Sequence, residues 1–184
     1  MFKELLKETR SVRRYEENRE IDRDTLVEIA ESIRYCPSAA NLQRVRIAII
    51  TGDLCQGVFD TLSFAAYLRP WVRPEEGERP VAYMVLMTKT EPDTNLAIDC
   101  GIAAEAIALS AREKGIGYCM FRSFNAENLT RVLGKEGYTS VLVISLGYPK
   151  ERVEIEDATD SLKYYRDENG VHHVPKLPLE DLIL

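Results

Sequence analysis

The stretch "NLAIDCGIAAEAIALSAREKG", residues 95–115, is rich in alanine and isoleucine around most of the circumference of the helix that it predicts. Gly115 ends that helix as a C-cap. A helix that is apolar nearly all round lies at the centre of a core or of an interface. We therefore expect one long central helix over residues 94–114, against which the other elements pack.

Helices and strands alternate on both sides of this helix. Strands are predicted at 46–51, 81–88, 116–121 and 141–147, and helices at the N-terminus, after Thr25, at 53–67 and from Asn125 to Gly134. Thr25 and Glu28 have the spacing of a capping box, and Pro37 stops the helix that they begin. The run "VAYMVLMT" (81–88) is continuously apolar, which indicates a strand buried on both faces.

The composition is that of a globular protein. With 184 residues, 45% of them hydrophobic, the chain is long enough to bury a sizeable core as a single domain over residues 1–184. A net charge of −6 argues against nucleic acid as a partner, because a phosphate backbone calls for a broad basic face. The sequence has neither a signal-peptide pattern nor a membrane-spanning apolar run, so we expect a cytoplasmic protein with no membrane partner.

Several classes of chemistry have no visible apparatus. The four cysteines form no CxxC pair and the two histidines are adjacent, so no metal site is expected and the thiols are expected to be reduced. No phosphate-binding P-loop, HExxH or GxSxG motif occurs. "GIGYCM" (115–120) begins like a dinucleotide fingerprint, but it lacks the third glycine and precedes a strand instead of a helix.

The C-terminal segment, residues 150–184, lacks the pattern of a compact element. It contains a turn signal, "DENG" (167–170), and then "PKLPLEDLIL" with two prolines. Its large apolar side chains need a surface to cover them: Tyr164, Tyr165, Leu177, Leu179 and Leu182. We expect an extended segment that packs on a second subunit.

Positive charge is concentrated near the N-terminus, in "TRSVRRY" (9–15). Arg10, Ser11 and Arg13 offer fork-shaped donors and a hydroxyl at close spacing, which suits a phosphate group. The alternative is that these arginines sit at a helix C-terminus, where the macrodipole favours cations.

A second segment, "CPSAANLQ" (36–43), follows the end of the second predicted helix. Its small residues allow the backbone to approach a flat ligand, and Asn41 and Gln43 carry amides able to read a polar ring edge. The alternative is an ordinary loop of proline, serine and asparagine.

Together these segments resemble the nitroreductase family, FMN-dependent reductases that begin with "RRSxRxF" and continue with "PSxxNxQPW". The corresponding segments here are "TRSVRRY" and "PSAANLQRV". The resemblance continues through "DCGIAAEAIALSAREKGIGYCM" (99–120) and ends with "HHVPKLPLEDLI" (172–183), similar to the family's closing "KxRxPLEE". It implies an α+β fold with a central, mostly antiparallel sheet flanked by helices. It also implies a domain-exchanged homodimer with FMN at the interface.

The resemblance assigns roles residue by residue. Arg10, Ser11 and Arg13 would hold the phosphate end and pyrimidine side of FMN, with Arg13 stabilising charge at flavin N1, and Lys176 would reach the phosphate. The partner chain would line the flavin ring with its own copies of Pro37, Ser38, Ala39 and Asn41. Ser123, with its neighbour Arg122, would present backbone to the reactive edge of the flavin.

The implied reaction is hydride transfer from NADH or NADPH, through FMN, to a nitroaromatic, quinone or related acceptor. "YLRPWVRPEEGERP" (67–80) would govern access, with Trp71 stacking on substrate and Arg69 or Arg73 attracting nicotinamide phosphates. The alternative for Trp71 is packing on its own domain.

The chain departs from the family pattern at Thr9, at Arg44 and Val45, at Lys176 and at Arg122, where relatives commonly have glycine. Arg122 could fill the substrate space or leave only its backbone at the flavin. It favours an alternative function, an FMN-binding protein with little turnover that acts as a flavin reservoir or redox sensor.

Overall fold

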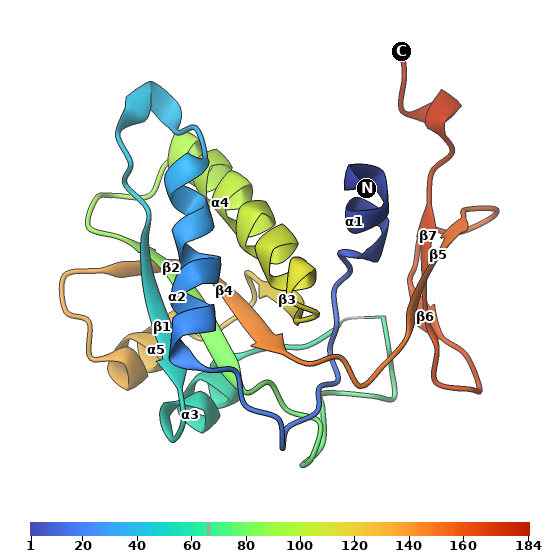
Figure 1. Cartoon of the computed structure of the whole chain (residues 1–184), viewed down its shortest axis with the longest axis horizontal. Helices are drawn as coiled ribbons and strands as arrows, with labels where there is room; N and C mark the ends of the chain where they lie inside the picture. The colour runs from blue at the N-terminus through green and yellow to red at the C-terminus, as the bar shows by residue number, and fades with distance from the viewer. Residues whose placement is uncertain (66) are drawn as a thin grey trace.

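A four-stranded antiparallel sheet forms the centre of the molecule in a computed structural model, which describes residues 1–65 and 67–184 (Figure 1). The strand order is β1-β2-β4-β3, and every neighbouring pair is antiparallel. The strands are β1 (Arg46–Thr51), β2 (Ala82–Thr88), β3 (Gly117–Phe121) and β4 (Thr139–Gly147). All four predicted strands are confirmed, as is the mostly antiparallel sheet.

Strand β2 is buried along its whole length, as its continuous apolar sequence predicts. Successive side chains of a strand point to opposite faces, so β2 supplies two cores. Met84 and Leu86 belong to the cluster that contains helix α4 (Thr94–Glu113). Tyr83 and Val85 belong to the cluster that contains helices α3 (Leu54–Thr61) and α5 (Ala126–Leu133). The sheet is therefore the middle of three layers, with helices over both faces (Figure 1).

Helix α4 (Thr94–Glu113) is the predicted central helix. The Asp93 side chain caps its first turn by accepting from Leu96 N at 2.7 Å. At the other end Gly115 takes φ +73°, which allows Ile116 N to donate to Ala111 O at 2.9 Å. Within the described residues, α4 alone is long and apolar enough to cross a membrane, but eight of its residues are buried in the protein, so it is a core helix.

The other helices are α1 (Phe2–Glu8), α2 (Arg23–Glu31), α3 (Leu54–Thr61) and α5 (Ala126–Leu133). The predicted capping box of α2 is wrong. The cap is Asp22, whose carboxylate accepts from both Thr25 N and Thr25 Oγ1, at 2.8 and 2.7 Å. Helix α3 is shorter than predicted, because the chain leaves it at Leu62 to bridge to Phe124.

The C-terminal segment carries a second, three-stranded sheet of order β5-β7-β6. Its strands are β5 (Val153–Asp157), β6 (Tyr165–Arg166) and β7 (His172–Lys176), and β5 runs parallel to β7. The predicted turn at 167–170 joins β6 to β7, with Gly170 N donating to Asp167 O at 3.1 Å. Residues 177–184 then project away from the molecule with exposed leucines (Figure 1).

Candidate functional site

The basic segment 9–15 runs along the outer edge of strand β3. Ser11 forms a bridge with Tyr118, and Val12 N donates to Tyr118 O at 2.7 Å. Gly117 permits this approach, because a Cβ there would lie 3.0 Å from Val12 Cγ2 and 2.9 Å from Pro149 Cγ. The fully buried Tyr15 then anchors the segment by donating to Val12 O at 2.6 Å. The backbone that carries Arg10, Ser11 and Arg13 is therefore fixed.

Arg10 lies against the C-terminus of α1. Its Nε donates to Thr9 O at 2.5 Å and its Nη2 donates to Leu6 O at 3.2 Å. These contacts match the helix-terminus alternative, since a cation at that end satisfies otherwise unpaired carbonyls. Within one chain, Arg10 thus acts as a helix cap.

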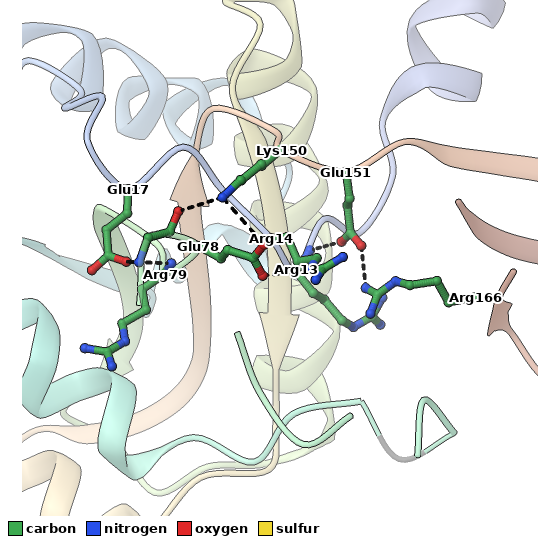
Figure 2. A network of polar contacts seen from close by, with 9 residues as sticks. Arg13, Arg14, Glu17, Glu78, Arg79, Lys150, Glu151 and Arg166 are labelled. Carbon is green, nitrogen blue, oxygen red and sulfur yellow. Dashed lines mark hydrogen bonds and ion pairs between the residues drawn. The ribbon is translucent and has the colours of Figure 1, made fainter. Parts of the chain in front are cut away.

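Arg13 connects the N-terminal segment to the C-terminal sheet. Its backbone N–H donates to Glu151 Oε1 at 2.5 Å, and its Nη1 lies 3.5 Å from His172 Nδ1. Its guanidinium carbon stands 5.0 Å from the centre of the Tyr164 ring. The second oxygen of Glu151 pairs with Arg166 at 2.5 Å, so one carboxylate ties both segments together (Figure 2).

His172 is held neutral in this cluster. Burial lowers its pKa to about 4, and the positive charges of Arg13 and Arg166 act in the same direction. Along β7, strand alternation puts His172, Val174 and Lys176 on one face. Lys176 is exposed and lies about 13 Å along the strand from His172. Arg13, which contacts His172, and Lys176 therefore lie on the same face of the small sheet.

A second ionic network lies beside the contacts of Glu151, on the left of the view in Figure 2. Glu78 accepts from Arg14 Nε at 2.7 Å and lies 3.6 Å from Lys150 Nζ. Glu17 accepts from the backbone N–H groups of Gly77 and Arg79, at 2.5 and 3.1 Å. These contacts join residues 14–17 to the loop before β2.

The segment 36–43 is a loop at the other end of α4, with several residues in left-handed backbone. It contains a short 3₁₀ turn (Ala39–Asn41), and Ala40, Asn41 and Gln43 have φ between +46° and +53°. Such left-handed backbone costs on the order of 1–3 kcal/mol per non-glycine residue, so the surroundings must enforce it. The buried Asp99 of α4 supplies one restraint by accepting from Ala39 N at 2.9 Å.

One chain does not bring the two halves of the predicted site together. The loop 36–43 contacts Asp99, whereas the N-terminal segment lies at the far end of α4, where Arg112 pairs with Glu8 at 2.8 Å. Thirteen helical residues separate these two contacts, which is about 20 Å along the axis. Pro37, Ser38, Ala39 and Asn41 are therefore remote from Arg13 and Lys176 of their own chain.

Ser123 and Arg122 follow strand β3. Ser123 O accepts from Ser63 N at 3.0 Å, which holds the strand end against residues 61–65. Arg122 folds back so that its Nη1 donates to Val141 O at 2.8 Å. It lines a groove of about 750 Å³ together with Cys100, whose pKa burial raises to about 11 and which is therefore a thiol at neutral pH.

The predicted access segment contacts the C-terminal sheet. The Trp71 ring stands edge-on to Phe64, with centroids 6.2 Å apart, and carries the Arg166 guanidinium 5.1 Å from its centroid. Tyr67 packs on Tyr164 at 5.2 Å. Arg69 is exposed, and Arg73 pairs with Asp60 at 3.4 Å. Trp71 thus packs on its own chain beside the cluster that holds Arg13.

An antiparallel sheet between two helical layers, with a basic segment on its edge strand, is an α+β fold of the nitroreductase type. The chain belongs to the nitroreductase family, whose model matches residues 6–148. It is therefore an oxidoreductase of that family.

Individual relatives are distant. The chain is 24% identical to "Putative NAD(P)H nitroreductase YdgI" of Bacillus subtilis (strain 168), over 79% of this chain and 87% of that protein. Among solved structures, a nitroreductase family protein from Streptococcus pneumoniae TIGR4 has TM-score 0.72 at 16% identity, covering 100% of this chain and 99% of that one. A nitroreductase with bound FMN from Desulfitobacterium hafniense DCB-2 has TM-score 0.65 at 22% identity, covering 98% and 95%.

Four residues of the site escaped the sequence analysis, because their partners are distant in the chain: Asp99, Glu151, Arg166 and His172. Asp99 lies within a family-like stretch but shows no local sign of a contact to the loop 36–43. The pair of Arg13 with Glu151 spans 138 residues. The residue types of Asp99, Glu151 and Arg166 were a partial indication, because a carboxylate or an arginine that is buried needs a partner.

Proposed function

We propose that this protein is an FMN-dependent oxidoreductase that passes a hydride from NADH or NADPH, through the flavin, to a nitroaromatic, quinone or related acceptor. The family membership supports the reaction class, and similar proteins are named for NAD(P)H and for bound FMN. The observation that carries the proposal is the convergence of the basic segment with strand β7, where Arg13 meets His172 at 3.5 Å. We place the protein in the cytoplasm, where reduced nicotinamides are available.

The residues present fit FMN. The phosphate end calls for cationic and hydroxyl donors, and Arg10, Ser11 and Lys176 supply them on neighbouring segments. When bound, FMN would supply the redox chemistry by accepting and releasing a hydride. The chain's part is positioning and electrostatics, and Arg13 would stabilise negative charge on the pyrimidine side.

The second half of the site would come from a partner subunit. Pro37, Ser38, Ala39 and Asn41 lie at the Asp99 end of α4, about 20 Å along the helix from the Arg112 end where the N-terminal segment packs, so a second copy must bring its loop 36–43 to the flavin. A partly exposed apolar stripe on α4 supports a homodimer: Ile98 and Gly101 are exposed, and Ile102 and Leu109, at helical spacing from them, are half-buried. The exposed leucines of 177–184 support packing of the C-terminal segment on the partner.

The open edge of β1 supports the same exchange of chain ends. Among the described residues β1 pairs with β2 alone, and a groove of about 510 Å³ runs along its other side. A partner's tail docked there would satisfy the edge. Substrates would enter past residues 67–80, where Arg69 and Arg73 offer positive charge and Trp71 an aromatic surface, and would meet the flavin edge beside Ser123.

Arg122 motivates the alternative, an FMN-binding protein with little turnover. Its guanidinium donates to Val141 O, so it lies along β4 in a groove that remains open. This placement supports turnover over the reservoir function, because the Arg122 guanidinium is held by Val141 O on β4.

The first test is the visible absorption spectrum of the purified protein, followed by titration of a stripped sample with FMN. We expect a co-purifying flavin band, and a roughly ten- to hundredfold weaker affinity for FMN in Arg13→Ala, as befits the loss of one charge-assisted contact. Arg152→Ala is the matched control, because Arg152 pairs with Glu154 at the exposed surface. A stripped protein that takes up no FMN would overturn the proposal.

Turnover is tested next, by NADH or NADPH oxidation with a nitro or quinone acceptor. If NADH or NADPH is oxidised at the same rate with and without the acceptor, the protein does not turn the acceptor over, and the low-turnover function replaces the proposed one.

A further inference from the structure

The cluster around Arg13 contains buried hydrogen-bond donors with no acceptor. His172 is fully buried, and its Nε2 has no hydrogen-bond partner among the described residues. Arg166 Nε and Trp71 Nε1 are also buried atoms without a partner among the described residues, although the two residues themselves are half-buried. Buried polar groups without partners are rare in folded proteins, so such a cluster indicates a missing acceptor.

The protonation of His172 follows from its neighbour. A guanidinium can only donate, so the contact from Arg13 Nη1 makes His172 Nδ1 the acceptor. In a neutral imidazole the proton must then sit on Nε2, which becomes a donor. His172 is kept neutral chiefly by its burial, which lowers its pKa, and the positive charges of Arg13 and Arg166 act in the same direction.

The three unpartnered groups lie within one compact region. Arg166 and His172 are directly opposed across the β6–β7 pair, so their side chains share one face of the small sheet. The Arg166 guanidinium in turn stacks on the Trp71 ring at 5.1 Å. The nearby carboxylate, Glu151, already accepts from Arg13 N and from Arg166 Nη2.

We propose that His172 Nε2–H, Arg166 Nε–H and Trp71 Nε1–H form a binding site for a small monoanionic group, a carboxylate or a phosphate, carried by a substrate. All three groups are donors, so the ligand must supply acceptors. While the flavin is oxidised and its pyrimidine side is uncharged, the guanidiniums of Arg13 and Arg166 and the carboxylate of Glu151 leave one net positive charge, which an anion of single charge balances. The site lies beside the access segment 67–80, and is separate from the FMN phosphate contacts assigned to Arg10, Ser11 and Lys176.

This inference rests on the proposed function in one respect, because it takes the anion to belong to the electron acceptor or to the reductant. A carboxylate would come from an acid-bearing acceptor, and a phosphate from the nicotinamide nucleotide. The binding itself can be measured without any turnover.

The experiment uses the single tryptophan of the chain. Its indole N–H gives one cross-peak in a ¹H–¹⁵N correlation spectrum, which moves when the group acquires an acceptor. The FMN-saturated protein is titrated with benzoate and, separately, with inorganic phosphate, at constant ionic strength. We expect a saturable displacement of the Trp71 peak with at least one probe, and the tighter probe identifies the source of the anion.

Variants at His172 separate binding from structure. His172→Phe should weaken the anion at least fivefold, whereas His172→Gln should retain most of the affinity, because its amide can accept from Arg13 and donate to the ligand. The exposed variant Arg152→Gln should behave as the parent. Equal affinities in the Phe and Gln variants would overturn the proposal.

The remaining outcomes distinguish this inference from the proposed function. If FMN binds and neither anion moves the peak, the donors are hydrated and the inference fails alone. If adding FMN to stripped protein moves the peak and blocks both anions, the donors belong to the flavin site and the separate site is overturned. If the anions bind and FMN does not, the inference stands and the proposed function falls.

Discussion

The two sheets of this protein are stabilised in different ways. In the larger sheet β2 is buried at every residue, and its side chains divide between two apolar cores. The smaller sheet is held by polar contacts, since Glu151 binds Arg13 and Arg166, and His173 lies between Glu156 and Asp167 at 3.1 and 3.4 Å. Apolar burial depends little on orientation, whereas a buried ion pair needs both partners in place. The larger sheet is therefore the scaffold, and the smaller sheet is an attachment whose position depends on ion pairs.

Leu86→Ala should have the largest effect, because it removes a fully buried side chain from the scaffold. We expect a loss of about 2–5 kcal/mol in the free energy of unfolding, measured by chemical denaturation. Val27→Ala, at an exposed position on α2, should change it by less than about 0.5 kcal/mol. A similar loss for both variants would mean that the scaffold is not a packed core.

Acid should act on the attachment through His172. Its folded pKa of about 4 lies below the ordinary value of 6.5, so the unfolded chain binds more protons between these values. Stability is then full above pH 6.5 and falls as the pH drops towards 4, by no more than roughly 3 kcal/mol. Denaturation at several pH values should show this slope in the parent and not in His172→Phe.

His173 should change stability with pH in the opposite direction to His172. Burial works to lower its pKa, but hydrogen bonds with Asp167 and Glu156 outweigh burial and raise it. Its contribution is therefore present below pH 6.5 and is lost as the pH rises through the raised pKa. His173→Gln should steepen the acid loss of stability, and a shallower slope in that variant would contradict this assignment.

Glu151→Gln should have a smaller and more local effect. The amide still accepts one hydrogen bond, but the charge that pairs with Arg166 is lost, which costs about 1.5–3 kcal/mol in docking of the smaller sheet. Hydrogen exchange should accelerate in residues 153–176 and remain unchanged in β2. Glu154→Gln, in an exposed pair with Arg152, is the control. Faster exchange in both sheets would mean that they unfold as one unit.

The same contrast explains how much the sequence predicts. Local patterns predict the strands of the larger sheet, helix α4 and the Asn125 and Gly134 ends of α5, because apolar periodicity and caps act over a few residues. They do not predict the pairing of β5 with β7, which joins Val153 to His172. The sequence did not predict Asp22 as the cap of α2, because Thr25, three residues later, is also a common N-cap residue. In the structure Thr25 instead donates to the Asp22 carboxylate.

For the site, the resemblance to the family predicts the segments 9–15 and 36–43 and Lys176, because each of these lies in a motif of consecutive residues. It could not indicate that Glu151 holds the Arg13 backbone, since a carboxylate 138 residues away leaves no local mark. Nor could it show the fold of Arg122 onto Val141 O, which depends on the position of β4.

The link between Arg13 and Glu151 also bears on the synthesis of the chain. The basic segment leaves the ribosome before the residues that it contacts, which are Glu151, Tyr164 and His172. A nascent chain that has reached Gly147 already holds all four strands of the larger sheet and none of these contacts. The contacts of Arg13 are therefore completed only after all four strands of the larger sheet have been synthesised, and a chain truncated before Glu151 would keep those strands and lack these contacts.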